Sequence, residues 1–243
     1  MIPRKHGLTA LGLSLVATLS GLALAASAAQ AAPEFYVKPA GTFVLAGLNL
    51  YFGLTEGSTV ALGGIELLIA NTTNYLFCEH QEWHGVINDL LSQGVLTEVT
   101  KLKRCKVLGA EATCKVVEPI TSKIKGELIT HAGEPYEIFK PETGEVLAEL
   151  KFENRGGEEC LYTGISPVKL RGSFAAEVLL GPAVTQVLHL NNTVYSLICE
   201  TAGKCGLKFG EKVAKFDGLD SLSLKNNAGA GYENNEGKEW EVK

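Results

Sequence analysis

The sequence predicts an all-β protein, built as an antiparallel β-sandwich or a flattened barrel in a single domain that follows a signal peptide. The first observation is that apolar or small residues alternate with polar ones along residues 167–180, which is the period of a strand with one buried face. The second is a series of short apolar runs separated by glycine, asparagine and proline turns. The third is the scarcity of helical patterns, and together these features indicate an all-β domain.

The N-terminal 31 residues have the composition of a secretory signal peptide. Basic residues precede an apolar stretch at residues 8–26, and Ala29-Gln30-Ala31 forms an A-x-A cleavage site. An uncleaved membrane anchor is the alternative, because the apolar stretch is almost long enough to span a bilayer. We expect cleavage after Ala31, which leaves residues 32–243 as the secreted domain.

Acidic residues outnumber basic residues in this chain, with 27 Asp and Glu against 22 Lys and Arg and a formal net charge of −5. Nucleic-acid binding requires clustered Lys and Arg to neutralise phosphates, so the composition argues against a nucleic-acid partner. No second apolar run approaches the ~20 residues of a spanning helix, so we expect no membrane span after signal cleavage. With nucleic acid and a membrane span disfavoured, the partners that we expect are a cell surface or an apolar ligand.

The first part of the domain predicts buried strands. Residues 42–52 and 59–70 are apolar at nearly every position, as in strands buried on both faces, although short buried helices fit the same runs. Residues 71–74 form a turn, and residues 75–78 a short strand after it.

Residues 86–105 are ambiguous. Their apolar residues fall at helical spacing, but Gly94 interrupts the pattern and β-branched residues follow it. We expect a strand over residues 95–105, and a helix is the alternative.

The second half of the chain alternates more clearly. We expect strands at residues 124–128, 146–152, 184–190, 194–199, 207–209, 214–216, 222–224 and 240–242. The alternation at residues 167–180 is longer than the ~10 residues of most strands, so this strand should bend. Gly172 is the expected corner, because an interior glycine often marks a bulge or bend at which one strand serves two packed sheets.

All six cysteines lie in the predicted mature chain: Cys78, Cys105, Cys114, Cys160, Cys199 and Cys205. In an exported chain an even number predicts three disulfides rather than free buried thiols, with fifteen possible connectivities. Cys105 and Cys114 flank a turn at Gly109 and can close locally. Cys199 and Cys205 flank a short loop and can do the same, which leaves Cys78 to pair with Cys160. Adjacent strands could equally join Cys78 to Cys105 and leave Cys114 for Cys160.

Three features of the chain occur together in one group of proteins. They are the signal peptide, the C…C-x8-C spacing at Cys78, Cys105 and Cys114, and a closing pattern of glycine and apolar positions from Leu207 to Val242. In these features the chain resembles uncharacterised secreted, disulfide-containing, β-rich bacterial proteins of unknown function. The resemblance implies a fold and a location, and no activity.

One segment combines residues that metals bind, Cys78-Glu79-His80-Gln81-Glu82-Trp83-His84. Zinc is held by His, Cys and Glu, and His80 and His84 would share one face of a helix. The segment nevertheless matches neither H-E-x-x-H nor H-x-x-E-H. We expect a solvated polar loop here, without a metal ion or cofactor.

No catalytic residue can be assigned from the sequence. Ser166 lacks the second glycine of G-x-S-x-G and precedes a strand, so it does not form a nucleophile elbow. Asp217 and Asp220 lack the spacing of a calcium loop. Paired carboxylates for glycoside hydrolysis cannot be located among 27 acidic residues.

These observations favour a secreted, non-catalytic β-protein over an enzyme. We expect it to bind a surface, a polymer or an apolar small molecule, because no catalytic motif is found. The alternative is a secreted hydrolase with an unrecognised carboxylate-based site. A concave apolar pocket with a few polar groups would favour ligand binding.

Overall fold

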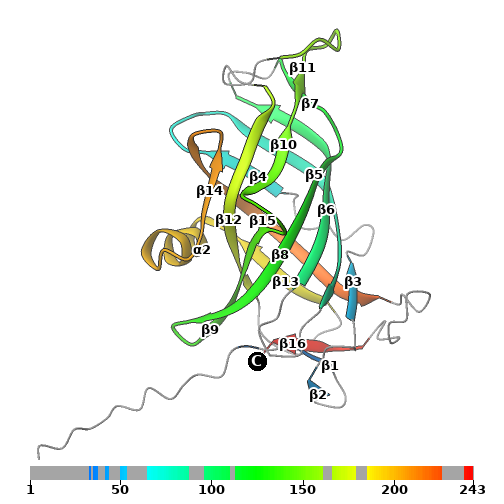
Figure 1. The fold of residues 1–243 in the computed structure, drawn as a ribbon, viewed down its shortest axis with the longest axis vertical. Coiled ribbons are helices and arrows are strands. Elements are labelled where there is room, and N and C mark those ends of the chain that lie inside the picture. Colours follow the sequence, from blue (N-terminus) through cyan, green and yellow to red (C-terminus); the bar gives the residue numbers. More distant parts are fainter. Residues whose placement is uncertain are drawn as a thin grey trace, which may run out of the picture. The chain divides into compact units, whose positions relative to one another are not determined.

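The computed structural model describes residues 33, 35–37, 42–43, 50–53, 65–87, 96–109, 113–160, 166–178, 185–225 and 238–242. Its strands are β1 (Phe35–Val37), β2 (Thr42–Phe43), β3 (Leu50–Gly53), β4 (Ile65–Ile69), β5 (Tyr75–Ile87), β6 (Leu96–Leu108), β7 (Lys115–Val116), β8 (Ile120–His131), β9 (Glu134–Pro141), β10 (Val146–Leu150), β11 (Phe152–Glu153), β12 (Val168–Val178), β13 (Thr185–Leu190), β14 (Gly206–Phe209), β15 (Lys212–Lys225) and β16 (Trp240–Val242). A short helical segment follows β13, comprising α2 (Asn192–Val194) and the π-helical turn η1 (Tyr195–Thr201). The all-β prediction is confirmed (Figure 1).

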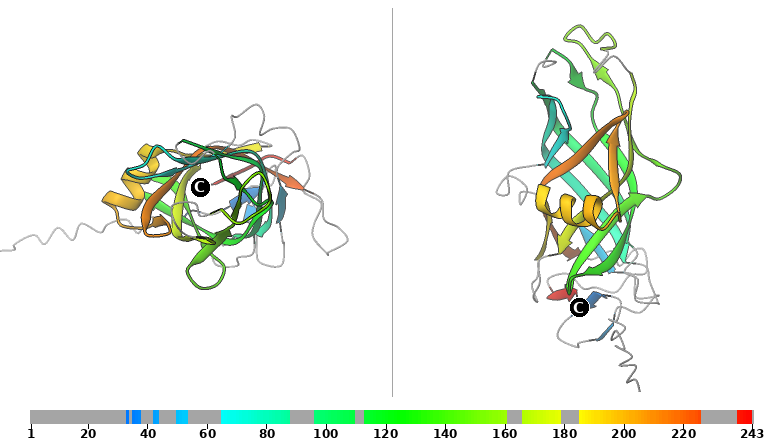
Figure 2. Two further views of the ribbon diagram at one scale, coloured as in Figure 1. Left: turned by 90° about the horizontal axis from the view of Figure 1, so that it is seen from above. Right: turned by 90° about the vertical axis from the view of Figure 1, so that its left-hand side faces the viewer.

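The main sheet is antiparallel and closes on itself. Its strand order is β10-β12-β13-β15-β3-β5-β6-β8-β9, and β9 pairs again with β12, from Phe139 opposite Phe174 to Tyr136 opposite Glu177. β4 lies between β15 and β5, and β14 between β12 and β15. Viewed from above, the strands surround a common interior (Figure 2). Of the two predicted architectures, the closed sheet is therefore the flattened barrel.

Two smaller sheets accompany the barrel. β1 lies between β2 and β16, so strands from the start and the end of the domain pair directly, with Phe35 opposite Val242. The rings of Phe35 and Trp240 pack there with their centroids 5.9 Å apart. The other sheet consists of β7 and β11.

By its internal contacts the chain divides between Ala31 and Ala32, and every element described here belongs to the second unit. The predicted signal peptide lies outside the described residues. Cleavage after Ala31 stays a prediction. Within the described part, the helical segment is too short to cross a membrane.

β12 is the strand that joins the parts of the barrel. Its first half pairs with β10 and β14, and its second half pairs with β9 and β13. The change of partners falls at Gly172, whose φ of +93° departs from strand geometry. The predicted irregularity at Gly172 is thereby confirmed, and its consequence is that one strand serves both ends of the barrel.

We expect Gly172→Ala to destabilise the protein more than Gly157→Ala. Both glycines have a positive φ, which costs a residue with a side chain about 1–3 kcal/mol. A Cβ at Gly172 would also lie 2.0 Å from the backbone oxygen of Gly206 on β14, whereas a Cβ at Gly157 would meet nothing within 4 Å. Urea unfolding of the two variants separates the cost of backbone strain from the cost of the steric clash. Equal losses of unfolding free energy would contradict the close approach of β12 and β14.

β5 and β6 form a long antiparallel pair that resolves one prediction and corrects another. Residues 96–108 form a strand, so the strand expected at residues 95–105 is confirmed. The polar loop expected at residues 79–84 is wrong, because this segment continues β5 as far as Ile87. Polar residues are compatible with a strand here because β6 pairs along its length and satisfies the backbone groups of β5.

The strand expected at residues 194–199 is also wrong, because this segment is helical. Asn191 provides the N-cap, its side-chain oxygen accepting a hydrogen bond from the N–H of Val194 at 2.8 Å. Val194, Tyr195, Ile198 and Cys199 recur at helical spacing and pack together against the outer faces of β9 and β12. The sequence contains both signals of this helix, the N-cap residue and the helical spacing, but its apolar run also fits a strand.

The disulfides are Cys78–Cys105, Cys114–Cys160 and Cys199–Cys205. The predicted Cys199–Cys205 pair is confirmed, whereas the pairs Cys105–Cys114 and Cys78–Cys160 are wrong, and the alternative connectivity is correct. Cys105 lies within β6, directly opposite Cys78 on β5, rather than beside the turn. Cys114 and Cys160 are brought together because they adjoin the paired strands β7 and β11.

Candidate functional site: the barrel interior

The interior of the barrel is formed by apolar side chains from every second residue of its strands. Ile120, Ile124 and Leu128 of β8 alternate with more exposed neighbours, and Leu170 and Phe174 of β12 do the same. These side chains belong to one hydrophobic core. The period of two in the sequence therefore determines which side chains meet inside the barrel.

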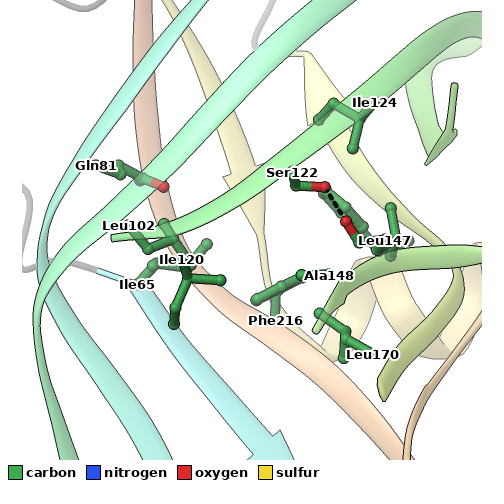
Figure 3. Close-up of a pocket in the computed structure, with 11 residues that line it drawn as sticks. Ile65, Gln81, Leu102, Ile120, Ser122, Ile124, Leu147, Ala148, Leu170 and Phe216 are labelled. Carbon is green, nitrogen blue, oxygen red and sulfur yellow. Dashed lines mark hydrogen bonds between the residues drawn. The ribbon is translucent and has the colours of Figure 1, made fainter. Parts of the chain in front are cut away.

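A cavity of about 40 Å³ lies within this core (Figure 3). One water molecule needs roughly 10–15 Å³, so the cavity is large enough for a small guest. It is lined by Ile65, Gln81, Leu102, Ile120, Ser122, Ile124, Leu147, Ala148, Leu170, Phe174 and Phe216. A second apolar cavity of about 10 Å³ shares five of these residues and extends toward Leu67, Leu76, Cys78 and Leu150.

Among the described residues, two polar side chains line the cavity of about 40 Å³, and both have partners within the protein. The hydroxyl of Ser122 donates a hydrogen bond to the carbonyl oxygen of Leu147 at 2.5 Å, as the dashed line in Figure 3 marks. Gln81 is 2% exposed and has an interaction partner of its own. A cavity with so few free polar atoms excludes water and favours apolar guests.

A local irregularity in β5 and β6 places Gln81 on the interior wall. Cys78 and Gln81 are both buried although they are three residues apart, which breaks the period of two. The break coincides with Arg104 on β6, whose φ is +50°, and the N–H groups of Arg104 and Cys105 both donate to the carboxylate of Glu118. This carboxylate replaces the missing strand partner and stabilises the irregular backbone.

Two rings that line the cavity, Phe174 and Phe216, form an aromatic group with Phe139. Phe174 stacks on Phe139 with a centroid distance of 5.0 Å, and its ring meets Phe216 edge to face at 4.8 Å. Phe139 is fully buried, and Phe174 is 6% exposed. Because they come from β9, β12 and β15, these rings connect three strands across the interior.

Beyond this aromatic group lies a buried carboxyl, that of Glu137. Glu137 alternates with Phe139 along β9 and is opposite Leu128 of β8 and Ala176 of β12. It is 1% exposed, and its Oε1 atom has no hydrogen-bond partner. Burial raises the pKa of the Glu137 carboxyl well above its ordinary value, because the apolar surroundings disfavour the charged form.

Gly126 provides the space for this carboxyl. A Cβ at Gly126 would lie 2.1 Å from Oε1 of Glu137, so any other residue there would displace the carboxyl. Gly126 is the next interior position of β8 after Ile124, which lines the cavity. The carboxyl consequently lies about one side-chain layer, roughly 7 Å along the strand, from the cavity wall.

The raised pKa of Glu137 predicts a loss of stability with rising pH. The unfolded chain releases this proton near pH 4.5 and the folded protein only at higher pH, so folding retains the proton between these two values. The unfolding free energy of the wild type, relative to Glu137→Gln, should therefore fall as pH rises above about 4.5. Urea unfolding from pH 4 to 9 measures this difference, and two parallel curves would contradict the buried carboxyl.

The residues considered from the sequence alone do not assemble into a chemical site. Cys78 is in a disulfide, and His80 is half-buried on β5. Among the described residues, no three His, Cys, Asp or Glu side chains could together hold a metal ion. Ser166 immediately precedes β12, and Asp217 and Asp220 both lie within β15.

Glu137 was missed by the sequence analysis, which assigned no strand at residues 134–141. Its signal is the segment Tyr136-Glu137-Ile138-Phe139, a carboxylate within an otherwise apolar run. Tyr136 and Ile138 pack under the helix on the outer face of β9, so both faces of this strand are buried. An alternation with polar residues, which would have identified the strand, is absent for this reason.

Comparisons with protein-family models, curated proteins and solved structures give no match to this chain. The resemblance to secreted β-rich bacterial proteins stays a prediction, and the interior of the barrel is the basis for a functional proposal.

Proposed function

We propose that this protein is a secreted, non-catalytic binding protein that holds a small apolar molecule inside its barrel. The observation that carries the proposal is the cavity of about 40 Å³, nine of whose eleven lining residues are apolar. Binding sites for small molecules are typically concave, mostly apolar and supplied with a few placed polar groups. An eight-stranded barrel is also about the size that encloses one small ligand.

The cysteine chemistry supports the extracellular part of the proposal. Three intramolecular disulfides are typical of proteins in oxidising compartments, and no described cysteine is free. The described surface carries few large apolar side chains, and Val117 and Val213 are the exposed ones. A polar outer surface around an apolar interior suits a protein that carries its ligand in solution.

Export predicts a defined N-terminus. The secreted protein should begin at Ala32, because Ala29 and Ala31 are the small residues that signal peptidase requires. N-terminal sequencing of protein recovered from outside the expressing cell checks this result, and Met1 on membrane-bound material would favour the anchor instead.

The binding proposal is tested by titrating the mature protein with xenon, an apolar guest of a single atom, while methyl resonances are followed by NMR. The methyl groups of Ile65, Ile120 and Ile124 should shift in a saturable manner, and those of Val117 and Val213 on the surface should not. Ala148→Leu should abolish the shifts by filling the cavity, whereas Val117→Leu, an equally small apolar change on the surface, should preserve them. Equal responses in both variants, or none in the wild type, would overturn the proposal.

The hydrolase alternative makes a different prediction. Turnover of an ester, glycoside or peptide substrate that a single carboxylate substitution abolishes would replace the binding function with catalysis. The same preparation of mature protein serves for both experiments.

A further inference from the structure

The carboxyl of Glu137 is an unusual group to find in the interior of an apolar barrel. A buried polar atom without a hydrogen bond costs roughly 1–3 kcal/mol of stability, and most buried polar atoms in proteins have partners. Oε1 of Glu137 has none, although Gly126 makes room for the carboxyl. Oε1 of Glu137 is therefore a buried hydrogen-bonding atom to which the described residues supply no partner.

The position of this atom connects it to the cavity. Gly126, over which the carboxyl lies, and Ile124, which lines the cavity, are adjacent interior positions of β8. Phe139 and Phe174 pair across β9 and β12 at the position between Glu137 and the cavity. Rotation of the Phe174 side chain would join the cavity to the carboxyl, because this ring belongs to the cavity wall.

The chemistry of the site selects a class of ligand. Apolar walls accept a hydrocarbon body, and the buried Oε1 of Glu137 requires a hydrogen-bonding partner. A neutral carboxyl has one O–H donor as well as acceptor oxygens, so a hydroxyl or amine group, which both donates and accepts, can pair with Oε1. An ionised carboxyl would also pair with an ammonium group. A hydrocarbon without a polar group would leave Oε1 unsatisfied.

We propose that the ligand of the barrel interior is a small apolar molecule with a single hydroxyl or amine group, which forms a hydrogen bond with Oε1 of Glu137. This inference rests on the proposed binding function and specifies its ligand. Glu137 would then determine specificity, while the apolar walls supply most of the affinity.

The test compares three small probes with the same number of non-hydrogen atoms: propan-1-ol, propylamine and butane. NMR titration of the mature wild type should give about tenfold tighter binding of the alcohol or the amine than of butane, which has no hydrogen-bonding group. In Glu137→Leu this advantage should fall below threefold. Glu127→Gln is the matched control, since Glu127 lies beside Gly126 on β8 but is partly exposed and paired with Lys140. It should retain the full advantage.

Glu137→Gln distinguishes the two donors. The amide keeps an acceptor oxygen but cannot become negative, so an alcohol should keep its advantage and a charged amine should lose it. The carboxyl carbon resonance of Glu137 in the wild type provides a measurement that needs no variant, and it should shift with the alcohol but not with butane.

Two results would overturn the inference. One is equal affinity of butane, the alcohol and the amine in the wild type, and the other is an advantage of the alcohol or the amine that persists in Glu137→Leu. Failure of the binding function itself differs from these, because neither butane nor xenon would then bind at all.

Discussion

Phe174→Ala should destabilise the protein by about 3–5 kcal/mol, which is the usual cost of removing a large aromatic side chain from a packed core. Phe174 is 6% exposed and contacts two other rings, Phe139 and Phe216, from neighbouring parts of the barrel. The truncation would leave these rings without a partner and enlarge the cavity that Phe174 lines. Urea unfolding monitored by circular dichroism measures the loss.

Lys169→Ala on the same strand is the control for this prediction. Lys169 lies on the outer face of β12 and pairs with Glu149 at 3.4 Å, where both side chains are more than 40% exposed. Exposed ion pairs contribute little, so the change should stay within about 0.5 kcal/mol. Similar losses at Phe174 and Lys169 would mean that the two faces of β12 do not differ in burial.

The second large effect should follow removal of the Cys114–Cys160 disulfide by a double substitution to alanine. This bridge spans a sequence separation of 46, the longest of the three, and on the chain-entropy model it restricts the unfolded chain by about 4 kcal/mol. It also fastens the small sheet of β7 and β11, where two strands of two residues each contribute few backbone hydrogen bonds.

The double alanine variant of Cys199 and Cys205 is the matched comparison. Its bridge spans a separation of only 6, for which the same model gives roughly 2 kcal/mol. Unfolding under oxidising conditions should rank the two variants in this order. Non-reducing peptide mapping of the wild type should recover a fragment joining Cys114 to Cys160, and a fragment joining Cys105 to Cys114 would contradict the observed pairing.

The parts of the fold that the sequence predicts are those in which a local pattern decides the structure. The alternation along β12 identifies its buried face, and Gly172 identifies its irregular backbone. The helix at residues 192–201 could have been predicted from Asn191 and from the spacing of Val194 and Ile198. A run of apolar residues fits a strand and a short buried helix equally well. Only the N-cap residue and the spacing of the apolar residues distinguish the helix from the strand here.

The candidate site could not be predicted in this way, because it depends on pairing between distant strands. Glu137 and Gly126 are eleven positions apart in sequence, and only the register of β8 and β9 shows that one makes room for the other. The same reason explains the disulfides. Cys78 and Cys105 could be paired only after β5 and β6 were known to be neighbours in that register.

The pairing of β1 with β16 imposes an order in time on the formation of the native structure. A ribosome makes β1 first and β16 last, so β1 must remain without this partner until almost the whole domain has been synthesised. The same holds for β3, whose neighbour β15 is made late. Strands β1 and β3 therefore lack these partners until late in the synthesis of the domain, and the barrel cannot be complete before β15 has been made.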